Sequence, residues 1–158
     1  MKILALAASN SRQSINKMLV TYAAGLLEGG LIDNAEIDII DINDYEMPIY
    51  SADREQDSGI PEQGHAFYKK IGEADAILIS YAEHNGSYTA AYKNLYDWTS
   101  RIDMKVYQGK AMVILATSPG PGGASSVLSA AKNSAPYEQI STPAHYALDS
   151  SRFPQRCS

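Results

Sequence analysis

The chain alternates between short, uninterrupted apolar runs and longer segments with apolar residues at helical spacing. Residues 3–8, 76–80 and 111–117 form three runs that are almost free of polar side chains. A strand of this kind must be covered on both faces, which is typical of a parallel sheet enclosed by helices. Residues 36–40 alternate at their start, as an edge strand does. Four strands are therefore predicted.

Helical patterns separate these strands. Apolar residues recur at helical spacing over residues 15–26, and Gly29-Gly30 follows where a capping glycine belongs. Further helices are predicted from Pro61 onward, over residues 88–102 and over residues 123–132. With right-handed crossovers this order gives an α/β doubly wound parallel sheet.

The end of the chain fits this pattern less closely. We expect one domain over residues 1–158, and a sheet of this type takes a fifth strand after Lys132. The candidate is residues 144–148, next to Pro143, which disfavours a central strand. The segment from about residue 134 is therefore either a degenerate edge strand or an irregular tail.

Charge and cysteine content narrow the function classes. Lys and Arg number 13 and Asp and Glu 18, a net charge of −5 that argues against nucleic acid or an anionic membrane as partner. Cys157 is the single cysteine, so an internal disulfide and a cysteine-based metal site are excluded, and we expect a reducing cytoplasm. Eleven tyrosines against two phenylalanines suit half-wet surfaces.

Three polar loops follow strands one, three and four, where open parallel sheets bind ligands. The first loop leads into the first helix, whose free N–H groups and positive dipole end form an anion site. It contains no glycine, so it suits a terminal monophosphate better than a pyrophosphate. The alternative is that Ser14 only caps the helix. The anion-site residues are Ser9, Ser11, Arg12, Ser14, Ile15 and Asn16.

The second and third loops are rich in backbone groups. In the second, Glu83 and His84 could form an acid–base pair, but adjacent residues of an extended segment point apart. A turn with positive φ at Asn85 and Gly86 is favoured instead. Residues 118–123 are stiffened by prolines and bare of side chains at glycines, so they can lie against a flat ring. The second and third loops thus each present a surface of backbone groups, called a backbone wall here. A monophosphate site that faces two such walls suggests FMN.

Four segments together resemble the NADPH-dependent FMN reductase family. They are residues 9–16, Glu83-His84-Asn85-Gly86-Ser87, Lys93-Asn94 with Asp97-Trp98, and residues 118–123. Residues 44–50 also resemble the family's segment after strand two, and the match covers about residues 2–133. Three positions depart from the family pattern: Ala8 replaces a glycine, Ala82 a proline and His84 a tyrosine.

The resemblance implies a flavodoxin-like sheet in the order 2-1-3-4 and an NAD(P)H-dependent flavin oxidoreductase with bound FMN. Hydride would pass from NADPH or NADH through FMN to a small acceptor such as a quinone, an azo dye, chromate or free flavin. The flavin would do the chemistry, so no catalytic residue and no metal ligand is assigned. The expected cofactor-binding residues beyond the first loop are Ala82, Glu83, His84, Asn85, Gly86, Ser118, Pro119, Gly120, Gly122 and Gly123.

Other readings remain open. A flavodoxin-type electron carrier would bind FMN without turning over NAD(P)H, and a decayed relative would bind no flavin. A serine hydrolase is disfavoured because no G-x-S-x-G motif is present. The aromatic residues Tyr92, Tyr96 and Trp98 are interpreted either as a surface for a homodimer or homotetramer, as the family implies, or as core packing.

Overall fold

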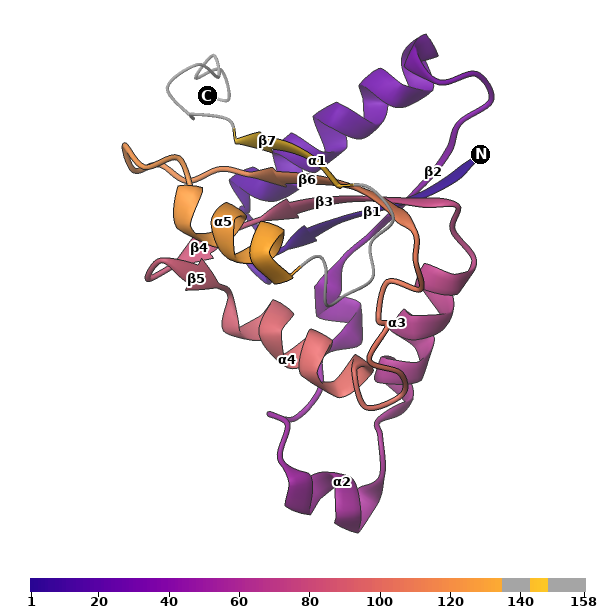
Figure 1. The fold of residues 1–158 in the computed structure, drawn as a ribbon, viewed down its shortest axis with the longest axis vertical. Helices are drawn as coiled ribbons and strands as arrows, with labels where there is room; N and C mark the ends of the chain where they lie inside the picture. The colour runs from indigo at the N-terminus through magenta and orange to yellow at the C-terminus, as the bar shows by residue number, and fades with distance from the viewer. Residues whose placement is uncertain (135–142, 148–158) are drawn as a thin grey trace.

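The computed structural model describes residues 1–134 and the main chain of residues 143–147 as a parallel sheet with helices on both faces (Figure 1). The strand order is β2-β1-β3-β6-β7, which confirms the predicted doubly wound arrangement. The strands are Lys2–Ala8 (β1), Glu36–Ile40 (β2), Ala76–Tyr81 (β3), Ala111–Ala116 (β6) and Pro143–Ala147 (β7). The candidate fifth strand is thus β7, parallel to β6. The rest of the predicted tail lies outside the described residues.

The helices divide unequally between the two faces of the sheet. They are Ile15–Leu26 (α1), Ala52–Ser58 (α2), Glu62–Gly72 (α3), Ala90–Thr99 (α4) and Ser125–Ser134 (α5). One face packs against α1 through Leu19, Val20 and Ala24. The other face packs against α3, α4 and α5, while α2 projects away from the sheet (Figure 1).

Local sequence signals explain where α1 begins and ends. The Ser14 side chain caps the first turn by accepting a hydrogen bond from the Lys17 N–H, 3.3 Å away. After Leu26 the chain makes a π-helical turn over Leu27–Leu31, and Gly30 there has a φ of 116°. Glycine adopts this φ without steric cost. Gly30 therefore interrupts the helical conformation about one turn after the end of α1, as predicted from Gly29-Gly30.

Two elements differ from the sequence prediction. Helix α2 was not predicted, because none of its residues is buried and it therefore carries no apolar stripe. The helix expected from residue 88 begins at Ala90, since Tyr88 belongs to a two-stranded hairpin of Glu83–His84 (β4) and Ser87–Tyr88 (β5). The Thr89 hydroxyl caps α4 by accepting from the Tyr92 N–H.

The aromatic residues of α4 correct the surface interpretation. Tyr92 and Trp98 are fully buried in the chain's own core, and Tyr96 is half-buried against it. Tyr92 and Trp98 therefore pack inside the chain, as the core interpretation predicted. Among the described residues, no helix has the length and apolar character needed to span a bilayer.

Candidate functional site

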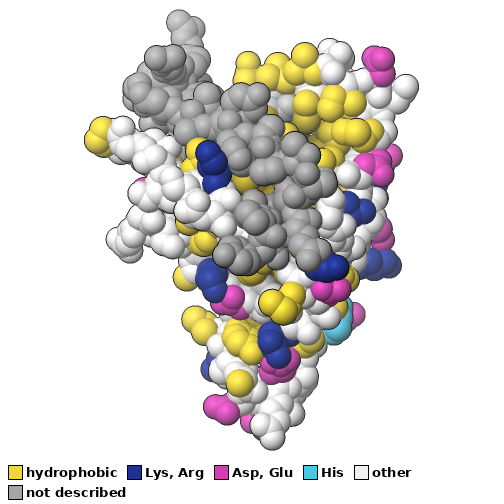
Figure 2. All heavy atoms as spheres, viewed as in Figure 1, with side chains coloured by type: hydrophobic (Ala, Val, Ile, Leu, Met, Phe, Trp, Pro, Cys, Tyr) yellow, Lys and Arg dark blue, Asp and Glu magenta, His cyan; other side chains and the backbone are white. Residues whose placement is uncertain are grey.

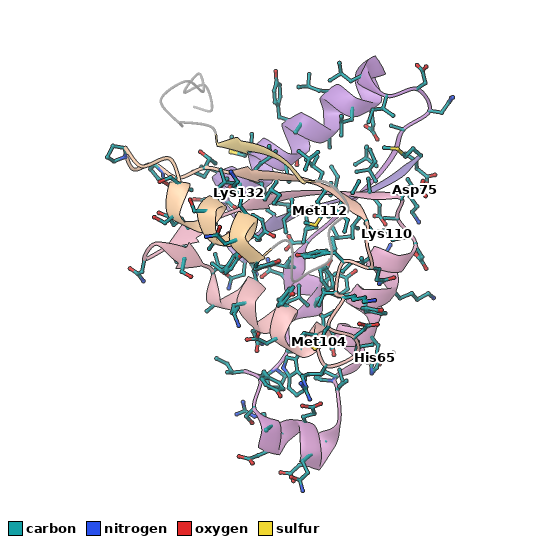
Figure 3. The ribbon with its side chains drawn as sticks, in the orientation of Figure 1. His65, Asp75, Met104, Lys110, Met112 and Lys132 are labelled. Atoms are coloured by element: carbon teal, nitrogen blue, oxygen red, sulfur yellow. The ribbon has the colours of Figure 1, made fainter. Side chains whose placement is uncertain are left out.

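The three polar loops begin at one edge of the sheet. In the parallel register Ala8 lies opposite Tyr81, and Tyr81 lies opposite Ala116, so β1, β3 and β6 end side by side. The hairpin β4–β5 and the start of α5 lie at this edge, whereas Asp75 and Lys110 lie at the edge where the strands begin (Figures 1 and 3). Residues far apart in the sequence thus meet at the carboxyl ends of the strands.

The first loop leads into the N-terminus of α1. Ser9 and Ser14 are buried, whereas Ser11 and Arg12 are exposed. The Ser9 hydroxyl accepts from the Ser11 N–H at 3.3 Å, which fixes the turn. Because Ser14 caps the third N–H of the helix, the first two N–H groups have no partner within the helix. Together with the helix dipole, these groups are the feature on which the predicted anion site rests.

The charge around this loop is partly compensated. Lys17, in the first turn of α1, lies 2.5 Å from the Asp41 carboxylate. The hydrogen bond from Lys17 lowers the pKa of Asp41 below the ordinary aspartate value, and bonds from Asn43 lower it further. The Lys17 charge is therefore neutralised by Asp41, while the Arg12 guanidinium remains exposed on the loop.

Asn16 ties the first loop to the ends of two strands. Its Nδ2 donates to the Thr117 carbonyl at 3.0 Å, and its Oδ1 accepts from the Ser80 hydroxyl at 2.7 Å and from the Thr117 N–H at 3.1 Å. The side chain expected at a phosphate is thus committed to β3 and to the residue after β6. Its contact with a phosphate stays a prediction that rests on the main-chain N–H.

Thr117 has a buried hydroxyl that could serve a polar group of a ligand. Its Oγ1 is buried and, among the described residues, has no hydrogen-bond partner. A buried hydroxyl without a partner costs free energy, so such atoms commonly serve a bound group. Thr117 was not among the predicted site residues, although its position directly after an apolar strand was a usable signal.

The second loop is the tight hairpin that the sequence predicted. Asn85 and Gly86 have φ values of 53° and 75°, which suits a two-residue turn between antiparallel strands. The carboxylate of Glu83 accepts from the Val127 N–H at 2.8 Å, while His84 is exposed. The Glu83 carboxylate is thus engaged with α5, in agreement with the prediction that Glu83 and His84 point apart and form no acid–base pair.

Two glycines of the third loop have room for a side chain at ordinary contact distances. A Cβ added at Gly120 would meet nothing closer than the Ser118 hydroxyl at 3.9 Å, and one at Gly122 only the Ser125 hydroxyl at 3.8 Å. Packing inside the described chain therefore does not require these glycines. Their bare backbone fits a flat group lying against the loop. Gly123 differs, because its φ of 56° favours glycine directly.

A cluster of tyrosine rings packs between the β4–β5 hairpin, the end of β3 and helix α4. Tyr81 packs on Tyr88 and Tyr92 at centroid separations of 5.4 and 5.1 Å, and the hydroxyls of Tyr81 and Tyr92 are 3.2 Å apart. Tyr92 also shares a short hydroxyl contact with Tyr107. The abundant tyrosines, expected at half-wet surfaces, thus include a buried group whose hydroxyls bond to one another.

The motif Lys93-Asn94 with Asp97-Trp98 anchors the segment after β2. Asn94 donates to the carbonyls of Met47 and Pro48 and accepts from the Tyr50 N–H, and the Trp98 indole donates to Pro48 at 2.7 Å. The sequence singled out this motif but gave no role for it. The structure places it in support of the fold, beneath residues 47–50.

The family model described as NADPH-dependent FMN reductase matches residues 1–151. A 2-hydroxy-1,4-benzoquinone reductase from Burkholderia sp is 36% identical over 124 residues, which are 78% of this chain and 63% of that protein. The chain thus spans less than two thirds of the length of this relative.

Two solved structures share the fold. The flavoenzyme NAD(P)H:(acceptor) oxidoreductase FerB from Paracoccus denitrificans aligns with a TM-score of 0.69 and 26% identity, covering 93% of this chain and 75% of FerB. An FMN-dependent NADH-azoreductase from Bacillus anthracis, solved in complex with FMN, gives a TM-score of 0.71 at 13% identity, covering 96% and 88% of the two chains. The second likeness concerns the fold alone.

Proposed function

Because the chain belongs to the NADPH-dependent FMN reductase family, we propose that it binds FMN and transfers reducing equivalents from NAD(P)H to a small acceptor. Quinones, azo compounds, chromate and free flavin are the acceptor classes in view. The names of similar proteins favour a quinone. The choice between NADPH and NADH stays open.

The residues at the strand ends fit FMN. The start of α1 offers free N–H groups and buried hydroxyls of Ser9 and Ser14 to a single phosphate. The hydroxyl of Thr117, which has no partner within residues 1–134, is available to a polar group of the cofactor. The hairpin turn at Asn85-Gly86 and the bare loop around Gly120 supply backbone surfaces for the ring.

In this proposal the cofactor and the protein have different roles. Bound FMN supplies the hydride chemistry between nicotinamide and acceptor. The chain's residues hold the phosphate, fix the two backbone walls and leave one side accessible, so no side chain needs to act as acid or base. The proposal is carried by the N-terminus of α1 together with the buried Thr117 hydroxyl, which lacks a partner in the described part of the chain.

A visible absorption spectrum tests this function. The purified protein supplied with FMN is expected to be yellow, and anaerobic NADPH or NADH should bleach it within seconds to minutes. A yellow protein that is not bleached would be a flavodoxin-type carrier. A protein that stays colourless with FMN would contradict the proposal. Replacing Thr117 with valine, which keeps the shape and removes the hydroxyl, should weaken FMN binding.

We propose further that the chain forms a homodimer or homotetramer through the outer face of α1. This face consists of exposed positions without charge: Ile15, Met18, Thr21, Tyr22, Gly25 and Leu26. Figure 2 shows hydrophobic side chains gathered at this side of the molecule. Two such faces can meet without opposing like charges, although the whole chain carries −5.

We also propose that the protein works in a reducing cytoplasm, because the sequence has a single cysteine.

A further inference from the structure

Helix α5 begins without a side-chain cap from the residue before it. Ala124 precedes the first residue of α5, carries no hydrogen-bond acceptor and has a φ of 64°, which is unusual for a residue other than glycine. A helix that starts at alanine is less stable than one with a polar cap by about 1 kcal/mol. The first turn of α5 therefore needs an acceptor from elsewhere in the chain.

Glu83 provides that acceptor from 44 positions away. Its Oε2 accepts a hydrogen bond from the Val127 N–H at 2.8 Å. Val127 is the third residue of α5, whose N–H is the usual target of a capping oxygen. The carboxylate also faces the positive end of the helix dipole, where a negative charge is stabilising.

The β4–β5 hairpin contacts both the first turn and the last residue of α5. Near the first turn, a Cβ added at Gly86 would lie 3.9 Å from the Ser126 Cβ. At the last residue of α5, the Tyr88 and Ser134 hydroxyls are 3.2 Å apart. The third loop runs directly into α5. The two backbone walls proposed for the cofactor ring are therefore joined through α5, and Glu83 lies at their junction.

We infer that Glu83 is a positioning residue that couples the hairpin to the third loop and sets the spacing of the two walls. This inference rests on the proposed function, since the walls matter only if they hold a flavin. Glu83 also neutralises the N-terminus of α5, so the anion site of this edge is left to α1. A phosphate is thereby directed to the Ser9–Ser14 loop rather than to α5.

Three substitutions separate the hydrogen bond from the charge. Glu83→Ala removes both, and Glu83→Asp keeps the charge on a side chain one methylene shorter, which cannot reach Val127. Glu83→Gln keeps an acceptor at full length without the charge. Glu62→Ala, at an exposed glutamate in the first turn of α3, is the matched control.

Amide hydrogen exchange at Val127 in the FMN-free protein gives a readout independent of the cofactor. Glu83→Ala and Glu83→Asp should exchange at least tenfold faster than wild type, and Glu83→Gln should stay within about threefold. FMN dissociation constants from flavin fluorescence quenching should follow the same order. The midpoint potential of bound FMN should rise in Glu83→Gln, because a nearby negative charge is lost.

Each failure has a distinct meaning. Unchanged Val127 exchange in both Glu83→Ala and Glu83→Asp would overturn the cap. Faster exchange with unaltered FMN affinity would overturn the coupling to the cofactor walls. A wild-type protein that binds no FMN would contradict the proposed function, while exchange at Val127 would still decide whether Glu83 caps α5. If Glu83→Ala does not fold, Glu83→Asp carries the same comparison.

Discussion

At the scale of single residues, the Asn16 side chain connects the start of α1 to the ends of β3 and β6. It bonds to Ser80 and Thr117, which come from the ends of two other strands. The sequence indicated a polar residue near the helix start, but it could not indicate the partners. Thr117 lies 101 positions away, and only the parallel pairing of β3 and β6 brings it to this place.

Replacement of Asn16 by alanine should strongly destabilise the fold. Three buried groups would lose their partner, namely the Ser80 hydroxyl and the N–H and C=O of Thr117, so we expect a loss on the order of 3 kcal/mol in unfolding free energy. Urea denaturation of the FMN-free protein measures it. Asn133→Ala, at an exposed position of α5, should change stability little. Equal effects of the two substitutions would contradict this role of Asn16.

The pair of Lys17 and Asp41 predicts a pH dependence. Folding lowers the pKa of Asp41, chiefly through the hydrogen bond from Lys17, so the pair stabilises the fold above the ordinary aspartate pKa. This stabilisation is lost as the pH falls through the lowered pKa of the folded state. Asp41→Asn should therefore reduce the urea midpoint at pH 7, and its difference from wild type should shrink toward pH 2–3. A difference independent of pH would contradict the assignment, and Asp33→Asn serves as the exposed control.

At the scale of elements, the apolar pattern predicted the sheet well. The continuous runs marked β1, β3 and β6, because strands buried on both faces have no polar alternation. The hairpin was predicted as a turn by Asn85-Gly86, but Tyr88 of its second strand was assigned to the following helix. Helix α2 was missed because it buries nothing. Periodicity reports burial, so elements that lack buried residues leave no such signal.

The segment after β2 should depend on α4. Trp98→Phe keeps an aromatic ring in the core but removes the bond to the Pro48 carbonyl, and Asn94→Ala removes its bonds to Met47, Pro48 and Tyr50. Each should cost about 1 kcal/mol or somewhat more and should speed proteolysis between residues 47 and 61. Limited proteolysis read by mass spectrometry locates the cut. Lys93→Ala, in the exposed ion pair with Asp97, is the control, and cleavage at an unchanged rate in Asn94→Ala would contradict the anchor.

At the scale of the whole molecule, the two faces of the sheet are covered unequally. Among the described helices, α1 packs on one face and three helices pack on the other (Figure 1). Met18 and Tyr22 are 60% and 63% exposed on the outer face of α1. An uncharged surface of this kind commonly marks an interface.

Charges on the outer face of α1 should prevent assembly. The double variant Met18→Lys with Tyr22→Lys is expected to elute at the 17.1 kDa of one chain, whereas wild type should elute at a multiple of that mass. Ile49→Lys with Met104→Lys, at apolar positions that are 70% and 80% exposed elsewhere, should elute as wild type does. Light scattering coupled to chromatography measures the masses. A wild type of 17.1 kDa, or an assembled α1 variant, would contradict this interface.

The long-range hydrogen bonds at the strand ends also order events during synthesis. The Asn16 amide emerges from the ribosome early, but its partner Thr117 follows 101 residues later, and Glu83 waits 44 residues for Val127. Contacts with such separations close late, because the intervening chain must first be folded. Residues 9–16 are therefore synthesised long before Thr117, to which Asn16 bonds. The capacity to retain a cofactor should appear only after β6 and the start of α5 have docked, so cofactor capture would mark the completion of this edge in a newly made chain.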